Sequence, residues 1–324
     1  MEDSTAYCGS DVSRGNIIPL ISSYVAGPLG LMHLPRLWLK GLLHAADILA
    51  EDWGCGPGGL DKRIMDAVGI DGSVFMPWLL QAFPTYEACE AWVVEHACRL
   101  SPDSIARSNG DLASAPLPRG LGPQFRRYLK IEDDVNPIEV GIMLNNLDDW
   151  MAIHRYLSEW RDGLDPVVPA ISPSTSGPLG IVHIPRLWLK GVLAAVAALP
   201  AGYARVREAA DSSVLDMLGI DSGESELLLT GMPTYVQYEA WIRERLPKDA
   251  GTAISAANCT LTRAETQAAE ALDWGLLHQM IGERYRAAPK KPAASLIGIR
   301  PFKMPLASAA RAGNGEDGAS RNIS

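Results

Sequence analysis

The chain has 324 residues, of which 47% are hydrophobic and 21% charged, and its formal net charge is −9. This composition is typical of a globular protein, and the negative charge argues against a nucleic-acid partner, which needs a basic surface. The sequence has no apolar run approaching the roughly 18 residues of a membrane span, and the acidic N-terminus lacks the order of a signal peptide. The five cysteines form no CxxC pair, which argues against a disulfide framework. We therefore expect a cytoplasmic protein with neither nucleic acid nor membrane as a partner.

The hydrophobic pattern along the chain is dominated by helical periodicity. Pro35 suits the first turn of a helix that runs to about residue 50, because its missing N–H needs no partner there. Further on, Asp61, Asp71 and Thr85 are expected to cap helices, and Gly69 to end one in a left-handed conformation. The later helices are expected at 61–69, from 71, at 86–99, from 101 and at 147–160. We find no alternation typical of strands, so the sequence predicts an all-α fold.

The most informative feature of the chain is an internal repeat. Residues 27–41 recur at 177–191, and only three apolar positions differ between the two segments. The match begins earlier, at 17–22 and 167–172. A weaker echo closes each unit, with Asp-Trp-x3-His at 149–154 and again at 273–278. The period is too long for a solenoid, and each copy is large enough to bury a core.

We therefore predict two homologous small helical domains in tandem that form a pseudo-dimer, with homo-oligomerisation as a further option. Copy one covers 17–163 and copy two 164–287. An N-terminal tail is expected over 1–16. The segment 288–324, which is rich in Ala, Gly, Pro and Ser, is expected to be disordered.

Both copies keep the motif His-x-Pro-Arg-x3-Lys at the predicted start of a helix. Two cations one turn apart repel each other, and cations near a helix N-terminus oppose its dipole. A compensating anion is therefore expected, either a carboxylate such as Asp61, Asp66 or Glu90 or an external ligand that also uses backbone N–H groups. The candidate catalytic residues are His33, Arg36, Lys40 and Tyr86 in copy one, with His183, Arg186, Lys190 and Tyr235 in copy two.

The histidine is the candidate acid or base, since imidazole titrates near neutrality. The alternative is a buried histidine that fixes the adjacent glycine-rich turn. A tyrosine hydroxyl can donate to a ligand, whereas the tryptophans Trp38 and Trp92 are expected in the core.

Copy one carries three accessory candidates, His44, Asp47 and Asp61. The spacing of Arg36, Lys40, His44 and Asp47 puts all four on one helical face, although a solvated polar face is the alternative. Copy two has alanine in place of both His44 and Asp47. The glycine-rich segment 54–59 is not followed by the Lys-Ser/Thr of a P-loop and is interpreted as a flexible loop, or a lid over the first site.

The sequence disfavours a metal site. His33 with His154, and a carboxylate from Asp61 or Asp149, have the residue types of a two-His-one-carboxylate site. Nearby Arg36 and other cations disfavour a metal ion, and the spacing matches no known metal motif. Nucleophilic triads and dinucleotide fingerprints are absent from the sequence, so we expect neither metal nor cofactor.

The motif, an Asp-x4-Asp-x2-Gly-Ile-Asp element after it and a later Glu-Ala-Trp together resemble a bacterial family catalogued as domain of unknown function 5069. The resemblance covers about the first 75 residues of each copy. It implies single small helical domains without an assigned activity, and its motif falls on the histidine, proline, arginine and lysine of each copy. This chain departs from the family in being a fused pair. It also has Leu39 and Leu189 before the lysine, where the family often has an acidic residue.

Two hypotheses follow. The first is an enzyme that binds a small carboxylate- or phosphate-bearing metabolite through Arg36 and Lys40 while His33 moves a proton, as a lyase, isomerase or cyclase without a redox cofactor. The second is a non-catalytic ligand-binding or assembly module in which the motif is structural.

Overall fold

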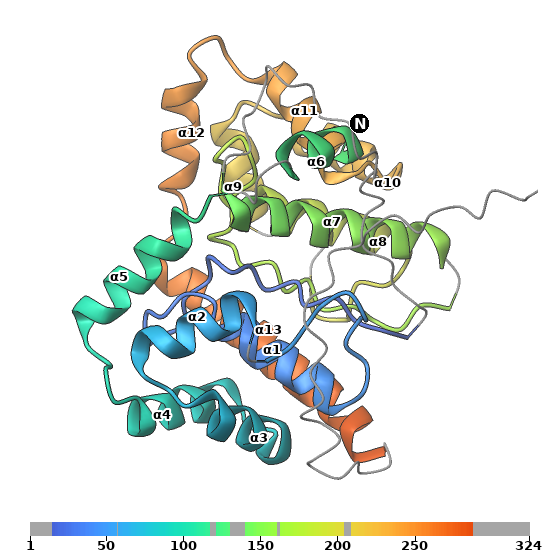
Figure 1. Cartoon of the computed structure of the whole chain (residues 1–324). Coiled ribbons are helices and arrows are strands. Elements are labelled where there is room, and N and C mark those ends of the chain that lie inside the picture. Colours follow the sequence, from blue (N-terminus) through green and yellow to red (C-terminus); the bar gives the residue numbers. More distant parts are fainter. Residues whose placement is uncertain are drawn as a thin grey trace, which may run out of the picture.

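The computed structural model describes residues 15–56, 58–116, 121–129, 140–160, 163–203 and 209–287. These residues form helices and a few isolated β-bridges, so the predicted all-α fold is confirmed (Figure 1). The predicted tail over 288–324 and nearly all of the one over 1–16 lie outside the described residues. Within the described part, no helix has the length and apolar character needed to cross a membrane.

The helices of copy one are α1 Leu34–Ala45, α2 Gly59–Val68, α3 Gly72–Ala82, α4 Tyr86–His96, α5 Pro102–Ala113, α6 Leu121–Leu129 and α7 Gly141–Glu159. Those of copy two are α8 Ile184–Ala195, α9 Ala209–Met217, α10 Ser222–Thr230, α11 Tyr235–Arg245, α12 Ala250–Asn258 and α13 Arg263–Ala287.

The helix that carries the motif lies at the centre of each copy. In α1 every residue from Leu34 to Leu43 is buried, including the two cations of the motif. Gly41 allows α3 to approach closely, since a Cβ there would lie 2.4 Å from a side-chain carbon of Leu79. Gly191 of α8 has the same relation to Leu229 of α10, at 2.5 Å. The motif helix is therefore a core element and not a solvated amphipathic helix.

Several predicted helix ends are found, although α1 ends at Ala45 and not near residue 50, and α4 ends at His96 and not at 99. Asp71 and Thr85 cap α3 and α4 by accepting hydrogen bonds from backbone N–H groups, and Gly69 ends α2 at φ 74°. The prediction that Asp61 is an N-cap, in contrast, is wrong. The cap of α2 is Gly58, and Asp61 lies inside the first turn of the helix, where its carboxylate is bound by distant residues.

The closing helix of each copy, α7 in copy one and α13 in copy two, packs against the other copy. In Figure 1 α13 runs beside α1, while α7 lies among the helices of copy two. The Trp274 ring of α13 lies 4.4 Å from that of Tyr86, and the Trp150 ring of α7 lies 4.4 Å from that of Tyr235. The contacts between the copies thus include two equivalent tryptophan–tyrosine contacts, one from each closing helix.

A second equivalent pair involves the two histidines of the closing helices. His278 Nε2 donates to the carbonyl oxygen of Phe83 at 3.0 Å, and His154 Nε2 donates to that of Met232 at 2.8 Å. Both acceptors lie at the turn that follows α3 or α10, and both have positive φ. Each closing helix therefore contacts the same turn in the opposite copy.

Candidate functional site

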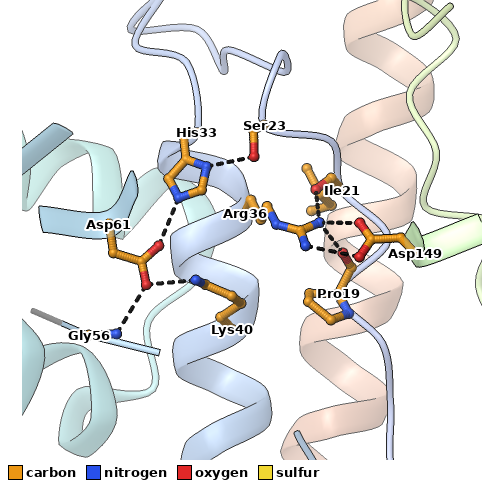
Figure 2. A network of polar contacts seen from close by, with 9 residues as sticks. All are labelled: Pro19, Ile21, Ser23, His33, Arg36, Lys40, Gly56, Asp61 and Asp149. Carbon is orange, nitrogen blue, oxygen red and sulfur yellow. Dashed lines mark hydrogen bonds and ion pairs between the residues drawn. The ribbon is translucent and has the colours of Figure 1, made fainter. Parts of the chain in front are cut away.

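His33 lies immediately before α1 in a left-handed backbone conformation, with φ 70°. This conformation is unfavourable for most residues other than glycine and is usually maintained by surrounding contacts. Here the contacts come from the imidazole, whose Nδ1 lies 2.8 Å from Ser23 Oγ and whose Nε2 lies 2.7 Å from Asp61 Oδ1 (Figure 2). Both ring nitrogens therefore have partners within the chain.

Asp61 is the centre of this network. Besides His33, its carboxylate accepts hydrogen bonds from Lys40 Nζ at 2.6 Å and from the backbone N–H of Gly56 at 3.0 Å (Figure 2). Burial opposes ionisation of Asp61, but the Lys40 charge and the bonds from His33 and Lys40 outweigh it and hold the pKa of this carboxyl well below its usual range. Burial lowers the pKa of His33 and so favours the neutral imidazole, although Asp61 acts in the opposite direction.

Arg36 has a different set of partners. Its guanidinium donates to both carboxylate oxygens of Asp149 on α7, at 2.7 and 3.1 Å, and also to the carbonyl oxygens of Pro19 and Ile21 (Figure 2). The indole N–H of Trp53 donates to the same carboxylate at 2.7 Å. Arg36 therefore joins α1 to α7 and to the segment 17–22, which explains why the sequence repeat begins before the motif.

Copy two contains the same two networks. Asp211 lies 2.6 Å from His183 Nε2 and 2.7 Å from Lys190 Nζ. Arg186 donates to Asp273 and to two backbone carbonyls of the segment 167–172, those of Pro169 and Ile171. The matched partners show that the arrangement belongs to the repeated unit.

Two partners differ between the copies. Pro173 stands where copy one has Ser23, and within the described part of the chain His183 Nδ1 has no hydrogen-bond partner. Tyr203 stands where copy one has Trp53, and its hydroxyl donates to Asp273 at 2.7 Å. The hydrogen bond to the closing-helix carboxylate is thus kept although the donor residue has changed.

Tyr86 supports the turn that precedes the motif. Its hydroxyl donates to Glu90 at 2.7 Å, and the same carboxylate oxygen accepts the backbone N–H of Leu29. A Cβ at Gly27 would lie 2.2 Å from the tyrosine hydroxyl, so only glycine fits there. Burial raises the pKa of Glu90 and raises that of Tyr86 well above its usual value.

The equivalent residues of copy two, Tyr235 and Glu239, make the same contacts with the turn at Leu179. Burial is more complete here and raises the pKa of Glu239 to about 7.

Of the accessory candidates of copy one, Asp61 is the centre of the network in Figure 2, whereas His44 and Asp47 are not part of it. His44 is in the last turn of α1, and Asp47 follows the helix at φ 60°, so the predicted common face ends before Asp47. Asp66, weighed as a partner for the motif cations, instead forms an exposed pair with Lys62 on its own helix. His154, weighed as a metal ligand with His33, contacts copy two instead.

Sequence reasoning missed Asn109, which belongs to the support of the motif. Its side chain accepts the backbone N–H of Met32 at 3.0 Å and donates to the carbonyl oxygen of Gly30 at 2.7 Å. Asn258 makes the same two contacts in copy two. The signal was present, because the two asparagines have the same 149-residue offset as Tyr86 and Tyr235.

Comparisons of the chain with protein-family models, curated proteins and solved structures find no match. The resemblance to domain of unknown function 5069 therefore stays a prediction.

Proposed function

We propose that the chain is a non-catalytic assembly module in which the repeated motif is structural. The observation that carries the proposal is that Arg36 and Lys40 are both buried, at 6% and 8% exposure, and both bonded to carboxylates of the chain. The equivalent cations in copy two have the equivalent partners. Such a cation needs no external anion to compensate its charge.

The motif also has a place in the assembly of the two copies. Arg36 binds Asp149, and the next residue, Trp150, packs on Tyr235 of copy two. In the same way Arg186 binds Asp273, next to the Trp274 that packs on Tyr86. The arginine of each copy therefore orients the helix that contacts the other copy.

The alternative is the enzyme that binds an anionic metabolite through Arg36 and Lys40 and uses His33 as acid or base. A ligand at this place would have to displace Asp61 or Asp149 from short, buried hydrogen bonds. That exchange is unfavourable, because a displaced carboxylate would remain buried without its partner. The geometry therefore supports the assembly module better.

The test is the thermal stability of the Arg36→Ala variant. Removing one member of a buried ion pair costs about 3–5 kcal/mol, so we expect the melting temperature to fall by several degrees. Arg186→Ala is expected to behave alike. Lys62→Ala is the matched control, since its exposed pair with Asp66 is expected to contribute less than about 1 kcal/mol.

The second arm of the test adds inorganic phosphate or a dicarboxylate to the unmodified protein. The assembly module predicts that neither anion changes the melting temperature. A saturable increase with millimolar phosphate that is lost in Arg36→Ala would favour the enzyme and overturn the proposal.

A further inference from the structure

A cavity of about 230 Å³ lies between the two copies, and its lining does not include His33, Arg36 or Lys40. Its walls come from the closing helices α7 and α13, from the segments 15–20 and 163–170, which precede the two motifs, and from Leu39 of α1. Several lining residues occupy equivalent positions in the two copies, including Ile17 with Val167 and Ile153 with Leu277. The cavity therefore depends on the contact between the copies.

The walls of the cavity are largely apolar. They include aliphatic side chains from both copies, such as Ile18, Leu20, Val168 and Ile281. An apolar cavity of on the order of 150 Å³ accommodates benzene and stays dry when empty. A cavity of about 230 Å³ has room for a longer hydrocarbon.

One side of the cavity is polar, because Arg284 of α13 lines it. The guanidinium donates to Asp165 at 2.5 Å and, through a longer bond of 3.3 Å, to the carbonyl oxygen of Gly15. Among the described residues these are two acceptors for five N–H donors. Asp165 is itself exposed, so its pair with Arg284 is weak. Arg284 can therefore bind a further acceptor, and a carboxylate suits its forked geometry best.

We propose that this cavity binds an amphipathic carboxylate, with an apolar body of about seven carbons between the copies and its acidic head on Arg284. This site is distinct from the anion site weighed for Arg36 and Lys40. It goes beyond the assembly role of the motif, although it needs the two copies to be in contact.

The probe is octanoate, titrated into the full chain and followed by calorimetry and thermal melting. We expect saturable binding of one octanoate per chain and an increase in melting temperature. Octan-1-ol and octylamine have other head groups and an apolar body one carbon longer, yet both are expected to bind at least tenfold more weakly, because they lack the charge-assisted bidentate bond to Arg284. Arg284→Gln should weaken octanoate binding about tenfold and leave that of octan-1-ol unchanged.

Ala170→Leu tests the location. Ala170 lines the cavity, and the equivalent residue of copy one is Leu20, which lines it too. The substitution thus introduces a side chain that the fold already accepts at the equivalent position. We expect it to fill the cavity, to abolish octanoate binding and to keep the melting temperature at or above that of the unmodified protein.

The proposal is overturned if octanoate does not bind saturably, if Ala170→Leu binds it as well as the unmodified protein, or if the three head groups bind alike. These outcomes do not bear on the assembly role of the motif. That role depends on Arg36 and is tested separately, with Arg36→Ala and with phosphate, which has no apolar body.

Discussion

Glu239 illustrates how burial of a single carboxyl links this fold to pH. Its side chain is 4% exposed and accepts hydrogen bonds from Tyr235 and from the backbone of the turn before the motif, and these bonds and the charge of Arg243 only partly offset the effect of burial. Burial therefore favours its protonated form and raises its pKa to about 7.

This pKa predicts the sign of a pH effect on stability. From the ordinary glutamate value of 4.5 up to about pH 7, the folded chain keeps a proton that the unfolded chain has lost. The contribution of Glu239 to the stability of the folded chain is therefore fully present below pH 4.5 and is lost as the pH rises through about 7. The unmodified protein should lose stability between pH 5 and pH 8, whereas Glu239→Gln should not lose this contribution. We therefore expect the free energy of unfolding of Glu239→Gln, relative to that of the unmodified protein, to rise by on the order of 2 kcal/mol from pH 5 to pH 8, measured by denaturant unfolding at both values.

The matched control is Glu90→Gln at the equivalent position of copy one. Glu90 is only half-buried, so the same comparison should give a smaller gain. Equal pH dependence in Glu239→Gln and the unmodified protein would show that the Glu239 carboxyl ionises alike in both states.

Tyr203 and Trp53 show that a hydrogen bond was kept while its donor changed. Tyr203→Phe removes only the hydroxyl that donates to the buried Asp273. Since Asp273 is 1% exposed and its carboxylate loses a hydrogen-bond donor that water cannot replace, we expect a loss of about 1–3 kcal/mol in the free energy of unfolding. Tyr203→Trp, which mimics copy one, should recover part of this loss in the same unfolding experiment. A Phe variant as stable as the unmodified protein would contradict the role of this bond.

At the scale of the helices, local chemistry explains what could be predicted from the sequence. Asp71, Thr85 and Ser101 cap helices through backbone groups two or three residues away, so each signal lies within one turn. The helix α7 begins at Gly141, earlier than the expected 147, and the sequence did not predict this start because its cap Val140 has no side chain that can accept a hydrogen bond.

The candidate site could be predicted only in part. The sequence left the anion that compensates Lys40 open between an external ligand and a carboxylate of the chain such as Asp61, Asp66 or Glu90, and in the structure Lys40 binds Asp61. The partner of Arg36 was not predicted, because Asp149 is 113 residues away and nothing local pairs them. The sequence also could not predict against which copy each closing helix packs. Since the copies share Tyr86 and Tyr235, contact of Trp150 with either tyrosine is chemically equivalent.

A prediction at this scale follows from the packing of each closing helix against the other copy. Trp274 packs against both Trp38 and Tyr86 of the other copy. Trp274→Ala should therefore destabilise copy one as well as copy two, by about 3–5 kcal/mol in total. We expect one cooperative transition at a lower melting temperature in calorimetry. Two separate transitions, with only the one from copy two shifted, would show that the copies fold independently.

For the whole molecule, the duplication implies that one copy alone lacks the contacts that its closing helix and its tyrosine make with the other copy. A fragment spanning residues 1–163 would leave Tyr86 without Trp274 and Trp150 without Tyr235. Because these residues are equivalent between the copies, Trp150 of a second fragment can pack on Tyr86 of the first, and the reverse contact forms by symmetry. We therefore expect the fragment to form a homodimer of about the mass of the intact chain, 34.9 kDa, in sedimentation velocity.

The control for this dimer is the same fragment with Trp150→Ala, which removes the aromatic contact from both sides at once. Its dissociation constant should rise by at least tenfold, since an interface aromatic typically contributes more than about 1.4 kcal/mol. A fragment that remains a folded monomer at micromolar concentration would mean that α7 packs back onto its own copy when copy two is absent. In that case the exchange seen in the intact chain would be a consequence of the linkage between the copies and not of their surfaces.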